Sequence, residues 1–549
     1  MQKPARVALI GAAIAALLTL PGLGNGTLWD NSETAYGEVA REILLFHQAV
    51  VMHLNGAPWF VQPPLYFWIA AAFAKIFGVG SLALRLPSAL ATIAMAAITG
   101  YAVTRAAGAR AGLFATIILS TSLMQAIVGR LAIMDALLDL AVALTLFWWW
   151  RALQTGGVKY FYFGWIAAAF GFLAKGPVAL VVALLVIVPF YFWNRRTEAM
   201  KPPRLQAWLA GIAIFCAVVL PWLLALVAQT GVQAVIQLLG HYTVGRYTGT
   251  IENQSGPLWY YLPVLILGFF PWVAFLPAAI VYGWNQARAN GVDDGARGLV
   301  RLALLWIVVP FAFFSLARTK LPNYIALELP GLALLVALYL DSIVQRYRRR
   351  SLMISAAAIP VTIACLAVAI VVFSHQNRLT ASASHLSGDL AAVGIALFVG
   401  SILTTMLFLS ERTARYAPYV LGAASFAGIS LLAIVALPQA EQFKPVPRLA
   451  AVIERERVAG DTVAISGVSG GNALVFYTRP GVETLAAADV RAPVDMATPH
   501  SVICGARRVF VLTSKRRPAF DPSYGRKRRL VAIDNNDALY LYEGPGCTQ

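Results

Sequence analysis

Long apolar segments, separated by short polar ones, run through most of the chain. A helix needs about 18–25 apolar residues to cross a hydrocarbon core of about 30 Å. The segments have this length, and they are too long and too unbroken for the strands of a membrane barrel. The pattern predicts thirteen transmembrane helices, at residues 7–23, 84–105, 111–127, 132–150, 160–174, 176–194, 206–228, 258–283, 300–317, 321–340, 352–373, 389–409 and 417–437.

Basic residues between the predicted spans indicate their orientation. If the N-terminus lies in the cytoplasm and the spans alternate, most Lys and Arg residues before residue 438 fall in cytoplasmic loops. The positive-inside rule therefore predicts a cytoplasmic N-terminus and an external C-terminal segment. The loops 24–83 and 229–257 and the turns at Arg130–Asp135, Lys175 and Arg318–Lys320 then lie at the external face.

The pattern changes after residue 437. Residues 448–459 have the composition of a helix, and several short runs rich in β-branched and aromatic residues follow. Some of these runs alternate apolar and polar positions, as half-buried strands do. We predict an all-α transmembrane domain over 1–437 and a small external α/β domain over 438–549. Its predicted strands are TVAISG, ALVFYT, RVFVLTS, LVAIDN and ALYLYEG.

The composition agrees with a membrane protein. The chain is 59% hydrophobic and 12% charged, whereas soluble domains carry about 25% charged residues. The net charge of +18 does not indicate nucleic-acid binding, because the cations lie in short loops rather than on one soluble face. The N-terminus resembles a signal peptide, but the many following spans favour a retained first helix.

The four cysteines suggest no zinc site, because no Cys and His residues have the spacing of zinc ligands. Cys216 and Cys365 lie in apolar spans and are expected to serve packing. Cys504 and Cys547 lie in the predicted external domain. In an oxidising compartment they would form a disulfide, and two free buried thiols are the alternative.

The first external loop is rich in acids. Glu33, Tyr36 and Arg41 fall on one face of a predicted helix by their spacing. Such a face would place a carboxylate and a guanidinium at the membrane surface, where they could carry chemistry. The alternative is structural: Asp30 and Glu33 have capping-box spacing, and Glu38 and Arg41 have the spacing of an ordinary surface pair.

Two further acids lie within a predicted span. Asp135 stands just inside its external end, and Asp139 lies one helical turn deeper. Ionisable residues inside a membrane are costly and are usually paired or functional. Asp135 is therefore a candidate site residue, and an ion pair with Arg130 or another basic residue is the structural alternative.

Several basic residues lie at the external face, against the topological rule. Snorkelling would explain any one of them, but several at one face favour an anion site. A lipid-linked phosphate is the expected anion at that depth, because lysine supplies a point charge and arginine a planar fork. These residues are Lys175, His241, Arg246, Arg318 and Lys320.

An ordered series of motifs resembles one family over residues 1 to about 340. The series includes LWDNSETAYGEVAREIL, HLNGAPWFVQPPLYFW, LRLPSALAT, the Asp135 span, the Lys-Gly-Pro at 175–177, GPLWYYLPVLILGFFPW and LARTKLPNYI. It resembles the bacterial inner-membrane glycosyltransferases of the C-type superfamily. The similarity extends to protein O-mannosyltransferases and, more closely, to the aminoarabinose transferases that modify lipid A.

The resemblance implies a reaction at the periplasmic face of the inner membrane. A sugar would pass from a polyprenyl-phosphate donor to a lipid or glycan acceptor such as lipid A, without a nucleotide sugar. Asp30 or Glu33 would position or deprotonate the acceptor, with help from Asp135. The resemblance assigns the donor phosphate to Lys175, Arg246, Arg318 and Lys320, with Tyr36, Arg41, Arg130 and His241 in support.

Three departures separate the chain from the aminoarabinose branch. Ser32 stands where the family commonly has Asp, and Asp30 would supply the missing carboxylate. Val61-Gln62-Pro63 stands where that branch has Glu-Lys-Pro, and Gln254 where it has a metal-ligating histidine. No cofactor is therefore predicted: the resemblance leaves a divalent metal open, but its ligand positions are not matched. The same departures leave acceptors other than lipid A open.

Two other functions were weighed against transfer. A carrier or flippase for a lipid-linked saccharide would show inverted repeats or broken helices at mid-depth, and the sequence shows neither. A structural or sensor protein would use the external domain to bind envelope components. Transfer remains the leading hypothesis, with a sugar donor, a glycolipid or glycan acceptor and membrane lipid as partners, and no nucleic acid.

Overall fold

The computed structural model describes residues 3–29, 32–195, 200–250, 254–289, 294–347, 383–441, 444–466, 468, 471–478, 482–484, 499–514, 526–534 and 537–544. The chain divides into two compact units. The first, here called the helical unit, comprises Met1–Leu23, Phe60–Ile69 and Arg85–Leu437. The second, here called the mixed unit, comprises Gly24–Trp59, Ala70–Leu84 and Pro438–Gln549.

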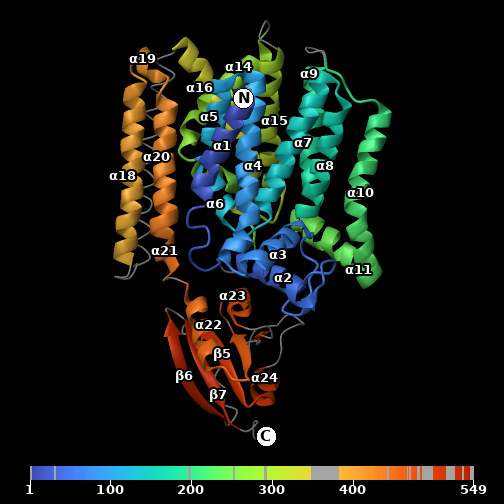
Figure 1. The fold of residues 1–549 in the computed structure, drawn as a ribbon, viewed down its shortest axis with the longest axis vertical. Helices are drawn as coiled ribbons and strands as arrows, with labels where there is room; N and C mark the ends of the chain where they lie inside the picture. Colours follow the sequence, from blue (N-terminus) through green and yellow to red (C-terminus); the bar gives the residue numbers. More distant parts are fainter. Residues whose placement is uncertain are drawn as a thin grey trace. The chain divides into compact units, whose positions relative to one another are not determined.

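Antiparallel neighbours joined by short turns make up the helical unit. Helices α7, α8 and α9 pack against one another, α10 packs on α8, and α18 packs on α20 (Figure 1). Its main helices are α1 (Lys3–Thr19), α4 (Ser81–Ala107), α5 (Ala109–Ser120), α6 (Leu123–Arg130), α7 (Asp135–Thr155), α8 (Val158–Lys175), α9 (Val178–Asn194), α10 (Leu205–Thr230), α13 (Tyr261–Gly268), α14 (Leu276–Arg288), α15 (Asp294–Leu316), α16 (Leu329–Arg346), α18 (Ala383–Leu407) and α20 (Ala417–Leu431).

The structure does not confirm the sequence prediction of thirteen spans. Within the described ranges, six helices are long and apolar enough to cross a membrane, or eight if each of two bent pairs counts as one span. The predicted span 352–373 lies outside the described residues. The predicted single span 258–283 is wrong as a straight helix, because its two halves meet at 111°. Pro271 lies at this break and cannot continue a helical hydrogen-bond ladder.

Buried tryptophans hold the helices of this unit together. Trp149 and Trp306 are almost fully buried. The Trp149 indole N–H donates to the Phe161 carbonyl at 3.2 Å, and the Trp306 indole N–H donates to the Leu327 carbonyl at 2.9 Å. Gly164 faces the Trp149 ring so closely that an added Cβ would collide with it. The small residue therefore lets α8 approach α7, and buried aromatic area stabilises the contact.

The mixed unit combines the first predicted external loop with the C-terminal segment. The loop contributes α2 (Ser32–Phe46) and a short hairpin of β1 (His53–Leu54) and β2 (Ala57–Pro58), and α3 (Leu65–Phe77) follows. Among the described residues, five strands form one sheet in the order β4-β3-β5-β7-β6. They are β3 (Thr462–Ser466), β4 (Val482–Thr484), β5 (Arg508–Ser514), β6 (Lys527–Asp534) and β7 (Asp537–Glu543).

Pairing in this sheet is parallel on one side and antiparallel on the other. Strand β3 pairs in parallel with β4 and β5, and β7 pairs antiparallel with β5 and β6. Apolar residues of α22 (Pro445–Glu456) and α23 (Gly471–Tyr477) pack with one face of the sheet. The other face packs with α24 (Pro499–Gly505). The sheet is thus covered by helices on both faces (Figure 1).

Two details of this segment differ from the sequence prediction. The run ALVFYT at 473–478 was expected as a strand, but residues up to Tyr477 form helix α23. All of residues 473–476 are buried, and periodicity cannot distinguish a short continuous apolar helix from a strand. The structure records Cys504 as disulfide-bonded. Cys547 lies outside the described residues, so that pairing stays a prediction.

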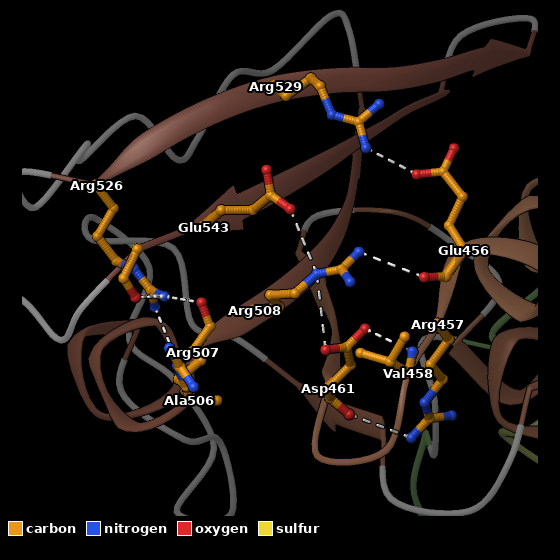
Figure 2. Close-up of polar contacts among 11 residues, drawn as sticks. Glu456, Arg457, Val458, Asp461, Ala506, Arg507, Arg508, Arg526, Arg529 and Glu543 are labelled. Atoms are coloured by element: carbon orange, nitrogen blue, oxygen red, sulfur yellow. Dashed lines mark hydrogen bonds and ion pairs between the residues drawn. The ribbon is translucent and has the colours of Figure 1, made fainter.

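A buried arginine ties the end of α24 to the end of β7. The guanidinium of Arg526 donates to the carbonyls of Ile503, Ala506, Arg507 and Gly544. Figure 2 shows Arg526 beside Ala506 and Arg507. The side chain of the neighbouring Lys527 is exposed. The guanidinium thus supplies donors to carbonyls at the end of α24, just after it and just after β7.

Arg526→Gln is expected to lower the stability of the mixed unit by about 2–3 kcal/mol, because one buried and three partly buried carbonyls lose a charged donor. Pulse proteolysis of the full-length protein in detergent would measure this loss, with cleavage followed in the C-terminal segment. Lys527→Gln removes an adjacent exposed cation and should change the stability little. Equal stability of Arg526→Gln and the wild type would show that this carbonyl cluster is not stabilising.

Candidate active site

The centre of the candidate site in the helical unit is an ion pair between Asp135 and Lys175. Lys175 Nζ lies 2.5 Å from Asp135 Oδ1, and both side chains are largely buried. The same carboxylate oxygen accepts a hydrogen bond of 2.7 Å from Asn323 Nδ2. The pair therefore links α7, α8 and the 3₁₀ segment Pro322–Glu328.

Local sequence places both partners. Asp135 is the first residue of α7 and Lys175 the last of α8, positions where the helix dipole favours an anion and a cation respectively. Gly176 has φ of 74°, a conformation that side chains rarely adopt. The Lys-Gly-Pro sequence thus ends one helix and starts the next beside the carboxylate.

Arg130 does not pair with Asp135, which decides one alternative left open by the sequence. Its Nη1 donates to the carbonyls of Leu18, Thr19 and Pro21, at 3.1, 2.9 and 2.9 Å. These carbonyls belong to the last turn of α1 and to the residues just after it. Arg130 therefore serves as a cap at the C-terminal end of α1.

A cavity of about 290 Å³ opens beside the ion pair. The Lys175 ammonium lies 4.8 Å from the centre of the Tyr324 ring, a cation–π distance. Apolar side chains, among them Leu138, Val178 and Val181, also line the cavity. The polar lining residues include Asp135, Asp139, Lys175, Arg246, Asn323 and Tyr324.

Arg246 reaches this cavity because backbone pairing holds its segment in place. The amide N–H groups of Arg318, Thr319 and Lys320 donate to the carbonyls of Tyr247, Arg246 and Gln254. These bonds fasten the second predicted external loop to the chain that follows α15. Arg246 lies in the short helix Gly245–Thr248, and Tyr242 and Tyr247 line the cavity beside it.

Two of the four predicted phosphate ligands lie elsewhere. Lys320 is 4% exposed, and its Nζ donates to the carbonyls of Ser315 and Ala317 at 2.6 Å each. It therefore caps the end of α15, and burial lowers the pKa of its ammonium. Arg318 and His241 have exposed side chains that do not line the cavity.

Further residues that line the cavity were not among the predicted site residues: Asn323, Tyr324, and Tyr242 and Tyr247 of the second loop. The signal for the first two was the LPNY sequence directly after Lys320, which begins a new helical segment with polar residues. Gln62 also lines the cavity and is buried. It is the residue that stands where the aminoarabinose branch has lysine.

In the mixed unit, α2 carries the predicted loop residues. Glu33 is 1% exposed, and its Oε2 accepts a hydrogen bond of 2.6 Å from the Trp29 backbone N–H, as a residue in the first turn of a helix often does. The Tyr36 ring meets Trp59 edge to face. Asp30 lies outside the described residues, so its predicted role stays a prediction.

Arg41 has a structural setting in the same unit. Its two terminal nitrogens donate to the carbonyls of Phe476 and Val475, at 3.0 and 3.3 Å. It also lies 2.5 Å from the carboxylate of Glu38. Arg41 therefore fastens α2 to the end of α23.

The structure corrects the expectation that Glu38 and Arg41 form an ordinary surface pair. Glu38 is fully buried, and Glu42, one turn further along α2, is 1% exposed. Burial raises the pKa of Glu38 to about 7, Arg41 opposes this rise, and Glu42 adds to it. Glu42 accepts a hydrogen bond of 3.0 Å from the Gly56 N–H, which holds the β1–β2 turn.

The residues at the family's metal-ligand positions do not fit a metal. Val61 offers no donor, and Gln254 offers only an amide. Across the described ranges, no three His, Cys, Asp or Glu side chains gather as ligands would. We therefore derive no step through a metal ion.

Comparison with known proteins bears on this geometry. Residues 61–224 match the family described as dolichyl-phosphate-mannose-protein mannosyltransferase. An undecaprenyl phosphate-alpha-4-amino-4-deoxy-L-arabinose arabinosyl transferase of Pseudomonas aeruginosa (strain UCBPP-PA14) is 32% identical over 60% of this chain and 58% of its own length. The transferase of the same name from Edwardsiella ictaluri (strain 93-146) is 30% identical over 59% of this chain and 57% of its own length. The chain thus spans about three fifths of the length of these curated relatives.

A solved structure covers almost the whole chain. The crystal structure of ArnT from Cupriavidus metallidurans bound to undecaprenyl phosphate matches with a TM-score of 0.80 over 97% of each chain, at 20% identity. The chain has an ArnT-like fold. This likeness and the relatives confirm the predicted resemblance to C-type glycosyltransferases, and the ArnT-like chain is a multi-pass membrane protein.

The raised pKa of Glu38 predicts a pH-dependent stability of the mixed unit. Because the folded state binds this proton more tightly than the unfolded state, with its usual pKa of 4.5, the stabilisation is complete below pH 4.5. It is lost as pH rises through about 7. The wild type should therefore lose up to roughly 3 kcal/mol between these limits relative to Glu38→Gln.

Pulse proteolysis of both proteins from pH 4.5 to 8 would measure this difference. Glu454→Gln removes a partly exposed carboxylate from the same unit and serves as the matched control. Parallel pH profiles for the wild type and Glu38→Gln would mean that Glu38 does not hold its proton in the folded state.

Proposed function

We propose that this chain is a glycosyltransferase that moves a sugar from undecaprenyl phosphate to an acceptor such as lipid A or another glycolipid or glycan. The observation that supports this most is the cavity of the helical unit. Its lining combines two cations, Lys175 and Arg246, with apolar side chains. The relatives named for an undecaprenyl phosphate donor add support.

The cavity fits the two parts of a lipid phosphate. The Lys175 ammonium keeps donors beyond the one given to Asp135, and Arg246 supplies a planar fork. Leu138, Val178 and Val181 offer an apolar surface to the first prenyl unit. A hydrophobic pocket with a few convergent polar groups is the usual form of a ligand site.

The same cations would assist bond cleavage. As the bond between the sugar and the phosphate oxygen breaks, its electron pair stays on that oxygen and negative charge grows there. Fixed cations in a site that excludes water stabilise such charge strongly. Because the carboxylate of Asp135 is bonded to Lys175 and Asn323, we assign it to positioning the ammonium rather than to accepting a proton.

The acceptor hydroxyl needs a proton acceptor as the new bond forms. We assign this task to Asp30 or Glu33 of the first external loop. We place the reaction at the periplasmic face of the inner membrane, with the N-terminus in the cytoplasm and residues 438–549 in the periplasm. The excess of Lys and Arg in the loops on the opposite side supports this orientation.

Lys175→Met is expected to lower the turnover of sugar transfer by about 100-fold, because the developing phosphate charge loses a fixed cation. The assay would use protein reconstituted in nanodiscs with an undecaprenyl phosphate-linked sugar. Lys159→Met, which removes a lysine that also lies over a tyrosine ring, is the matched control. Full transfer by Lys175→Met would refute the assigned role.

Removing the lysine alone also leaves a buried carboxylate unpaired, which costs about 3–5 kcal/mol. The double variant Asp135→Asn with Lys175→Met removes both charges, so it should fold better than Lys175→Met. It should remain inactive in transfer. Recovery of transfer in the double variant would show that the single variant failed only by misfolding.

Lipid A mass spectrometry would identify the acceptor. Cells that contain the protein are expected to show lipid A heavier by one sugar than cells that lack it. Unchanged lipid A would exclude this acceptor and direct the search to other glycolipids and glycans. If a labelled donor crosses the membrane without forming a product, the protein is a carrier of the lipid-linked sugar and not a transferase.

A further inference from the structure

A second buried carboxyl lines the cavity and has no part in the proposed transfer so far. Asp139 lies one turn after Asp135 on α7 and is 3% exposed. Its Oδ2 has no hydrogen-bond partner in the part of the chain that the structure describes. The ammonium of Lys175, the neighbouring cation, is bonded to Asp135 instead.

Charge balance in the cavity indicates the state of this carboxyl. With Asp135, Lys175 and Arg246 ionised, the lining carries one net positive charge, which suits an incoming phosphate. An ionised Asp139 would cancel that charge and would repel the phosphate. It would also be a buried carboxylate without a counter-charge, which is costly in a membrane-embedded site. A protonated carboxyl avoids both costs and becomes a hydrogen-bond donor.

We propose that Asp139 is a carboxylic acid that donates a hydrogen bond to the phosphate of a polyprenyl phosphate bound in this cavity. This inference rests on the proposed function. It assigns different tasks to two carboxyls one turn apart: Asp135 stays ionised and positions Lys175, while Asp139 stays neutral and faces the ligand. Environments that separate two neighbouring carboxyls in this way are typical of active sites.

The hydrogen bond gains strength during the reaction. The donor phosphodiester carries one negative charge, and the departing lipid phosphate carries two once the electron pair of the broken bond rests on its oxygen. A hydrogen bond to the more charged species is stronger. The proton stays with Asp139, and the proton of the acceptor hydroxyl leaves to the first external loop, so charge and atoms balance.

The titratable and charged groups that line the cavity with Asp139 come from α7, α8, the second external loop and the segment after Leu321. The groups are Asp135, Lys175, Tyr242, Arg246, Tyr247 and Tyr324. Ionisation of Asp139 would place a negative charge beside the phosphate, so it should weaken phosphate binding as pH rises. The second ionisation of the lipid phosphate itself, at about pH 6, is common to the wild type and its variants.

The test is binding of undecaprenyl phosphate to the full-length protein in nanodiscs from pH 6 to pH 9. Asp139→Asn keeps an N–H donor and cannot ionise, and Asp139→Leu removes the donor at similar size. At pH 6, Asp139→Asn should bind as the wild type does, and Asp139→Leu about tenfold more weakly. Towards pH 9 the wild type should lose affinity relative to Asp139→Asn.

Glu328→Gln is the matched control. Glu328 is a buried carboxyl of the same unit that has no hydrogen-bond partner among the described residues and does not line the cavity. This variant should follow the wild type at every pH. If Asp139→Leu fails to fold, the comparison of Asp139→Asn with the wild type alone decides.

Two negative results are distinguishable. If the wild type binds undecaprenyl phosphate and Asp139→Asn follows the same pH curve, the inference about Asp139 is overturned and the proposed function stands. If the wild type does not bind undecaprenyl phosphate at any pH, the proposed function fails and the inference fails with it.

Discussion

The ion pair between Asp135 and Lys175 is the interaction on which the rest of the candidate site depends. Either charge alone, buried in a bundle of apolar helices, would cost several kcal/mol of desolvation free energy. The fold offsets this cost in three ways. The charges lie 2.5 Å apart, each sits at the helix end whose dipole favours it, and Asn323 gives the carboxylate a further donor. The pair therefore links α7, α8 and the segment Pro322–Glu328, and it holds a cation in the lining of the cavity.

This arrangement explains why both charged and apolar side chains line the cavity. The cations and tyrosines gather at the ends of helices and in the second loop, where backbone pairing between residues 246–254 and 318–320 holds them. Apolar side chains from the first turns of α7 and α9, Leu138, Val178 and Val181, line the same cavity. A ligand with an anionic head and a prenyl tail matches both kinds of lining residue. The charged and apolar residues that line the cavity thus support the proposed lipid-phosphate donor.

Asp135 and Lys175 could be predicted from the sequence, because each stands in a short polar interruption next to a long apolar segment. The roles of other polar residues depend on neighbours that are distant in sequence. Arg130 and Lys320 look like ligands from their position, but each meets the carbonyls at a helix end. The run at 473–476 is buried throughout and forms part of helix α23, a state that periodicity does not distinguish from a strand. Tyr324 was missed because an aromatic residue at the start of a span is usually an interfacial anchor.

The most direct test of the account is a cryo-electron microscopy structure of the protein in nanodiscs with undecaprenyl phosphate. We expect the phosphate group within hydrogen-bond distance of Lys175 Nζ and of the Arg246 guanidinium, with the first prenyl unit against Leu138 and Val178. Asp135 should remain bonded to the ammonium. A phosphate bound instead at the exposed Arg318, with the cavity beside Lys175 free of lipid, would contradict the account.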